Sequence, residues 1–117
     1  MKRQLRNGHH TVSIEVEMAG SWWSRFKGLM LRKPLAEGQG LYLKKTNSIH
    51  MCFMRFAIDA IYFDKKGQVV KVVSDLSPWT GLSACLKAKD CLEMKAGEVK
   101  RLGIEVGMEL QQSVAGD

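Results

Sequence analysis

Residues 47–64 read N-S-I-H-M-C-F-M-R-F-A-I-D-A-I-Y-F-D, and this apolar run decides the fold. Its second half, residues 58–63, and the later residues 68–73 are both rich in β-branched or aromatic side chains, and they flank the sequence D-K-K-G. Gly67 can adopt the positive φ that a short hairpin turn requires. The segment therefore predicts an antiparallel hairpin in the middle of a β-rich protein.

Four polar side chains interrupt the same run: Asn47, His50, Arg55 and Asp59. Burying such groups without hydrogen-bond partners is costly, so each needs a partner or a solvated site. If residues 49–59 form one unbroken strand, His50 shares a face with Cys52, while Arg55 and Asp59 share the opposite face. Both faces are then apolar, as in a strand covered on both sides. His50 and Asp59 can converge only if the chain bends or bulges near Arg55.

The periodicity of the flanking sequence predicts further strands and two short helices. Residues 11–18 alternate strictly between apolar and polar side chains, which is typical of a half-buried strand. Shorter strands are predicted at residues 41–43, 91–94 and 107–112. Ser21 suits the start of a short helix that Gly28 can end, and residues 96–102 predict a second one that ends at Gly103.

Length and composition are those of a globular protein. The chain has 117 residues, of which 45% are hydrophobic and 26% are charged. About seven strands and two short helices predict one domain over residues 1–117, with a mainly β fold: a small closed or nearly closed β-barrel. No apolar run approaches the ~20 residues that cross a bilayer, and no apolar stretch follows the basic N-terminus. We therefore expect no membrane span and a cytoplasmic location.

Charge is distributed unevenly along the sequence. The net charge is +6, and residues 1–45 account for all of it, with nine lysines and arginines against three glutamates. Trp22, Trp23 and Phe26 lie among these cations, an arrangement that can stack bases and hold phosphates. Binding of nucleic acid through this basic N-terminal half is one alternative function. A solvated basic surface is the simpler interpretation, because no fold-specific nucleic-acid motif accompanies the cations.

Three segments of the chain resemble one family. They are W-W-S-R-F-K-G-L-M-L-R-K-P-L at residues 22–35, the stretch at residues 49–73, and L-E-M-K-A-G-E-V-K-R-L-G-I-E-V-G at residues 92–107. In this order they resemble domain-of-unknown-function family 192 (DUF192), which comprises small bacterial and archaeal domains. The resemblance implies a mainly β single domain and brings no activity, substrate or cofactor. Two residues depart from the family pattern: Ala57 replaces the usual Pro, and Met108 replaces an Asp, which removes a carboxylate from any site that would use it.

Thiols and imidazoles offer two chemical alternatives. His50 and Cys52 could ligate a metal together with a second cysteine, but their spacing is no recognised zinc pattern. A hydrogen-bonded His beside an inert Cys is the simpler interpretation, and no metal or cofactor is predicted. An enzyme could instead use Cys85 with His50 as a thiol–imidazole pair, if residues 74–90 bring that thiol to the strand, or Asp59 in a cleft.

The favoured interpretation is a non-enzymatic binding module for a small polar or anionic ligand. Arg55 and Asp59 are expected to tether loop backbone or opposite charges, with a grip on an anion as the functional alternative for Arg55. Residues 74–90 form a long connection, and such connections are often functional. The site is therefore predicted where this connection meets the strand at residues 50–59. The predicted ligand-binding residues are Asn47, His50, Arg55, Asp59, Trp79 and Cys85. The sequence makes no prediction of an oligomeric state.

Overall fold

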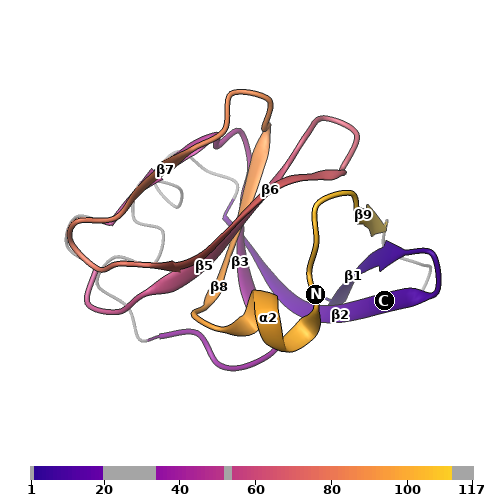
Figure 1. Ribbon diagram of the computed structural model, residues 1–117, viewed down its shortest axis with the longest axis horizontal. Coiled ribbons are helices and arrows are strands. Elements are labelled where there is room, and N and C mark those ends of the chain that lie inside the picture. Colours follow the sequence, from indigo (N-terminus) through magenta and orange to yellow (C-terminus); the bar gives the residue numbers. More distant parts are fainter. Residues whose placement is uncertain (1, 20–33, 52–53, 112–117) are drawn as a thin grey trace.

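The computed structural model describes residues 2–19, 34–51 and 54–111. Nine strands and one short helix lie in these ranges (Figure 1). Their bounds are β1 Lys2–Asn7, β2 His10–Ala19, β3 Gln39–Leu43, β4 Ser48–His50, β5 Ile58–Phe63, β6 Val69–Leu76, β7 Leu82–Ala84, β8 Asp90–Lys95, α2 Glu98–Leu102 and β9 Glu109–Gln111.

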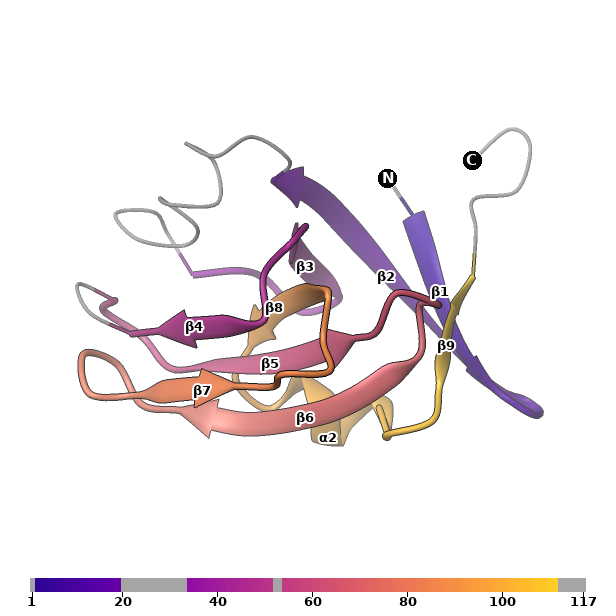
Figure 2. The same ribbon diagram turned by 90° about the horizontal axis from the view of Figure 1, so that it is seen from above.

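Seven of the strands form one strongly curled sheet, in the order β6-β5-β8-β3-β2-β1-β9 (Figures 1 and 2). β2 and β3 run parallel, and the other neighbours are antiparallel. The two ends of the sheet meet where Gln68 and Glu109 form an isolated bridge and the Leu110 N–H donates to the Gly67 carbonyl, at 2.8 Å. One bridge beside a three-residue β9 is no continuous ladder, so the sheet is an open half-barrel. The mainly β prediction is confirmed, but closure of the barrel is not supported.

β4 and β7 form a separate antiparallel pair that covers part of the large sheet (Figure 2). Ile49 of this pair packs in a first apolar core with Leu41, Ile58 and Tyr62 of the large sheet. A second core fills the inside of the curl and includes Phe63. Burial of each such side chain contributes about 1.5–3 kcal/mol, so these two cores hold the layers together.

β5 lies between the two cores, and all six of its residues are buried. Ile58, Ala60 and Tyr62 belong to the first core, while Ile61 and Phe63 belong to the second. The prediction of a strand covered on both faces is therefore confirmed for this half of the opening segment. The alternation predicted for the strand at residues 11–18 is confirmed as well, since β2 buries alternate residues.

The turn and the second helix of the sequence prediction are present. Gly67 has φ 81° in the turn between β5 and β6. α2 ends at Gly103, whose φ is 70° and whose N–H donates to Lys100 O. α2 is the one helix in the described ranges, whereas the helix predicted between Ser21 and Gly28 lies outside them.

Residues 49–59 do not form one unbroken strand, contrary to the prediction. β4 ends at His50 and β5 begins only at Ile58. The Met51 carbonyl accepts hydrogen bonds from the N–H of Met54, at 3.0 Å, and of Trp79, at 2.8 Å. The strand therefore stops before Met51, and Met51 is fastened to the connection between β6 and β7.

Candidate functional site

The β4–β7 pair brings together four of the six predicted site residues. Asn47 accepts a backbone hydrogen bond from Cys85, at 2.8 Å, and His50 ends β4 beside the Met51 carbonyl that binds Trp79. Asn47, His50 and Trp79 are exposed, and Cys85 is half-buried. The connection at residues 74–90 thus contacts residues 47–51 on the outer layer of the fold, and not a strand at residues 50–59 as predicted.

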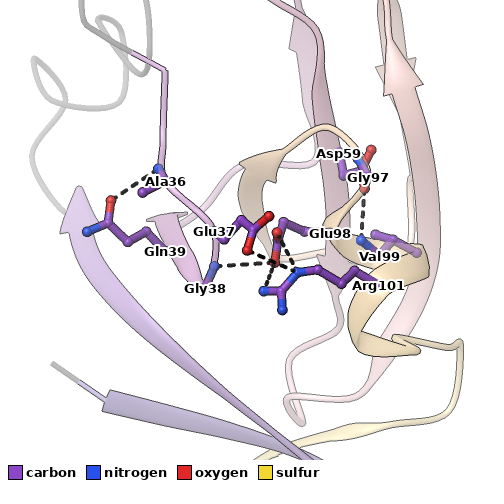
Figure 3. Close-up of polar contacts among 9 residues, drawn as sticks. All are labelled: Ala36, Glu37, Gly38, Gln39, Asp59, Gly97, Glu98, Val99 and Arg101. Atoms are coloured by element: carbon purple, nitrogen blue, oxygen red, sulfur yellow. Dashed lines mark hydrogen bonds and ion pairs between the residues drawn. The ribbon is translucent and has the colours of Figure 1, made fainter.

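Asp59 lies apart from that group, on the face of β5 that looks into the second core. It is fully buried, and its Oδ1 accepts from the N–H of Asp75 at 2.8 Å. Its Oδ2 accepts from Gly97 at 3.0 Å and from Val99 at 2.8 Å (Figure 3). The expected tether to loop backbone is confirmed for Asp59, which fixes the end of β6 and the start of α2. Arg55 is exposed in the connection between β4 and β5.

A second carboxylate beside Asp59 forms a clamp that the sequence did not reveal. Glu98, in the first turn of α2, receives two hydrogen bonds from the Arg101 guanidinium, at 2.9 and 2.6 Å (Figure 3). The Gly38 N–H, from the turn before β3, donates to the same carboxylate at 3.3 Å. The hydrogen bond from Arg101 lowers the pKa of Glu98, although burial opposes this shift. The clamp joins α2 to the turn before β3 and leaves Glu98 little freedom to act on a substrate.

Glu93 is a buried carboxyl of a different kind. It lies in β8 opposite Leu41 and Ala60, on the face that carries Cys91 and the first apolar core. Its Oε2 has no hydrogen-bond partner within the described part of the chain. Burial raises the pKa of Glu93 to about 7, because an apolar surrounding disfavours the charged form. Burial also raises the pKa of the neighbouring Cys91 thiol, which makes that thiol a poor nucleophile.

A tyrosine links the two layers. The Tyr62 hydroxyl donates to Ser83 Oγ of β7, at 3.0 Å. Burial raises the pKa of Tyr62 to about 12. This pair satisfies two buried polar groups and sets the position of β7 against β5.

The described ranges hold neither a metal-ligand cluster nor a helix long enough to span a membrane. Residues 2–19, 34–51 and 54–111 contain no cluster of three or more His, Cys, Asp or Glu side chains that could hold a metal ion. The one helix found there is far too short to cross a membrane.

A hollow lined by lysines lies between the β5–β6 turn and the β7–β8 connection. Its volume is about 470 Å³, and its lining residues are Asp64, Lys65, Lys66, Gln68, Lys87 and Lys89. We call it the lysine hollow. The two segments are joined where the Lys89 N–H donates to the Phe63 carbonyl, at 2.7 Å. In Figure 1 both lie at the end of the molecule opposite α2.

The charge of the lysine hollow is dominated by its cations. Among the described residues, none of the four lysines forms an ion pair. Asp64 Oδ1 accepts from the N–H groups of Lys66, at 2.9 Å, and Gln68, at 3.0 Å, so the single carboxylate is occupied in shaping the turn. Sequence reasoning missed this site, because two lysine pairs about 20 residues apart show no local pattern.

Comparison with known proteins gives a consistent family. The DUF192 family model, described as an uncharacterized ACR family, matches residues 3–112. A UPF0127 protein of Pyrococcus furiosus is 36% identical over 103 residues, which are 86% of this chain and 88% of that protein. A UPF0127 protein of Thermococcus sibiricus is 31% identical over 103 residues, 85% of this chain and 66% of that protein.

Two solved structures share the fold. A protein of unknown function from Novosphingobium aromaticivorans has a TM-score of 0.85 and 19% identity, covering 96% of this chain and 84% of that one. A protein from Sinorhizobium meliloti, described as a candidate transcription regulator, has a TM-score of 0.85 and 24% identity, covering 94% and 92% of the two chains. At these identities the likeness shows the fold alone. On the family match over residues 3–112 and the UPF0127 relatives, the chain belongs to the DUF192 family.

Proposed function

We propose that this chain is a non-enzymatic binding module for a small anionic ligand, and that the ligand occupies the lysine hollow. One observation carries the proposal: four lysines without ion pairs among the described residues line one hollow of about 470 Å³. Like charges gathered in one place repel each other and destabilise the folded protein. A bound anion relieves this repulsion, so the same feature that weakens the empty protein favours the complex.

The lysine hollow suits an anion with several oxygens. Lys65 and Lys66 approach from one segment, and Lys87 and Lys89 approach from another. Each ammonium group is a compact charge with three donors on a flexible stem, unlike the fixed fork of arginine. Four such groups can surround a phosphate or polyphosphate from two sides. The Asp64 carboxylate shapes the backbone of the turn that carries the first pair.

The placement of the candidate catalytic groups supports a binding role over an enzymatic one. Both oxygens of Asp59 hold backbone N–H groups. The Cys91 thiol is buried with a raised pKa. Asn47, His50, Arg55 and Trp79 are exposed on the outer layer and its flanks, where contacts with a polar ligand stay a prediction. The lysine hollow has the stronger support, because its lining is defined and its four lysines outnumber its single carboxylate.

Titration calorimetry with inorganic tripolyphosphate tests the proposal. We expect saturable binding to the natural chain and a large loss in the double variant Lys87→Ala/Lys89→Ala. The matched control is Lys100→Ala, which removes an exposed lysine from α2 at the other end of the molecule (Figure 1). A ligand at 100 times its dissociation constant also stabilises the fold by about 2.7 kcal/mol, which a thermal-shift assay detects. Equal binding by the double variant and the control contradicts the proposal.

A further inference from the structure

Large apolar side chains are strongly exposed in one short segment of the chain. Among the described residues, four large hydrophobic side chains are exposed: Trp79 (55%), Leu82 (75%), Leu86 (93%) and Val106 (58%). Three of the four lie within residues 79–86. Single exposed apolar residues need no explanation, but a concentration of them marks an interaction surface.

The fold directs these leucines outward and places Leu86 next to the lysine hollow. In β7, Ser83 points inward to Tyr62, so its neighbours Leu82 and Ala84 point outward. Leu86 is in the β7–β8 connection, immediately before Lys87, which lines the lysine hollow. The Lys71 ammonium group donates to the Ala84 carbonyl, at 2.8 Å, and adds a further cation beside β7. Exposed leucines and lysines thus follow one another along residues 82–89, and we treat this stretch and the lysine hollow together as one face.

We infer that this face docks on a membrane surface that contains anionic lipids. Lipid phosphates occupy the lysine hollow, and the side chains of Leu82 and Leu86 enter the boundary between headgroups and acyl chains. The inference rests on the proposed function, since it identifies the source of the anion that the hollow binds. Apolar insertion and attraction of lysines to anionic lipids act together in reversible membrane binding.

A bilayer explains more of this face than a free phosphate or a nucleic acid does. A free anion would contact the lysines and leave the leucines without a role. Single-stranded nucleic acid is held by a long basic groove with aromatic side chains on which the bases stack. Here the exposed residues next to the lysines are leucines, and the hollow is lined from two short segments. The lysines suit contact with lipid headgroups, and the leucines suit contact with the acyl chains beneath those headgroups.

Vesicle sedimentation tests the inference with the full chain. The probes are vesicles of phosphatidylcholine with phosphatidylglycerol, vesicles of phosphatidylcholine alone, inorganic tripolyphosphate, and a single-stranded oligonucleotide. Each lysine near an anionic surface changes affinity about fivefold, and each inserted methylene about fourfold. We expect Leu82→Ala/Leu86→Ala to lose at least tenfold in affinity for the anionic vesicles and to bind tripolyphosphate unchanged. Val106→Ala is the matched control, because it shortens an exposed apolar side chain outside residues 79–86.

The outcomes distinguish failure of the membrane inference from failure of the proposed anion binding. Binding to anionic vesicles that falls with the leucine variant and also with Lys87→Ala/Lys89→Ala supports the inference. Tripolyphosphate binding without vesicle binding, or vesicle binding that the leucine variant retains, overturns the inference and leaves the proposed function standing. Oligonucleotide binding through the same lysines without vesicle binding also overturns it. Loss of all anion binding removes the proposed function itself.

Discussion

Replacing Asp59 by alanine tests how the curled sheet is fastened to α2. The substitution removes the acceptor of three backbone N–H groups, those of Asp75, Gly97 and Val99. The hydrogen bond to Val99 is buried, so an orphaned N–H there costs about 1–3 kcal/mol, and the two partly buried ones cost about 1 kcal/mol each because water can replace the carboxylate. We therefore expect the free energy of unfolding to fall by about 4 kcal/mol, a large share of the 5–15 kcal/mol typical of a domain.

Urea denaturation followed by circular dichroism measures this loss. Asp64→Ala is the matched control, since Asp64 also accepts from two backbone N–H groups, but in an exposed turn. We expect the free energy of unfolding of this control to fall by only about 1 kcal/mol, because water reaches the freed N–H donors. Asp59→Asn keeps the side-chain shape and one acceptor oxygen, and we expect an intermediate loss of about 2 kcal/mol. If Asp59→Ala and Asp64→Ala lose the same amount, the role assigned to Asp59 is wrong.

Two further predictions concern other buried positions. The raised pKa of Glu93, about 7 against 4.5, means that the folded state holds its proton longer, so its contribution to stability is complete below pH 4.5 and is lost as the pH rises through 7. Urea denaturation measures the free energy of unfolding of Glu93→Gln and of the natural chain at each pH. From pH 4 to pH 8 we expect the difference between them to shift by about 3 kcal/mol in favour of Glu93→Gln, and a pH-independent difference would contradict this. A Cβ at Gly81 would lie 2.5 Å from Ser77 O and 2.8 Å from Met51 Cγ, so we expect Gly81→Ala to lose about 1–3 kcal/mol, which an unchanged urea midpoint would refute.

Local sequence patterns predicted those elements whose apolar pattern and turn glycine lie within about ten residues of each other. The hairpin of β5 and β6 followed from apolar runs around Gly67, and α2 followed from a short pattern that ends at Gly103. In both cases a glycine with positive φ supplies the turn, and this need is visible in the sequence. The tether role of Asp59 was also predictable, because a carboxylate in a fully buried strand must find donors.

Elements that depend on distant partners could not be predicted in this way. Of the six residues of β1, only Leu5 is buried, and the strand exists because β2 and β9 pair with its two sides. β4 and β7 have three residues each, too few to show a period. Strand propensity is weak where tertiary pairing decides, so β1 and β7 were not predicted and β4 was merged into a longer strand.

The same reason explains what was missed in the candidate site. Lys65 and Lys89 meet at one hollow because the Lys89 N–H bonds to Phe63 at the end of β5, and nothing in either local sequence shows this contact. The break in the strand after His50 likewise involves a distant partner, because the Met51 carbonyl accepts from the N–H of Trp79. Glu93 was recognisable in principle, because it shares a strand face with Cys91 and lies between the apolar residues Leu92 and Met94.

The most direct test of the central claim is calorimetric titration of inorganic tripolyphosphate into the natural chain and into Lys87→Ala/Lys89→Ala. We expect saturable binding with one site on the natural chain, weakened about 25-fold in the double variant at about fivefold per lysine and unchanged in Lys100→Ala. Absence of heat with the natural chain, or equal affinities in all three proteins, would contradict the claim that the lysine hollow is an anion-binding site.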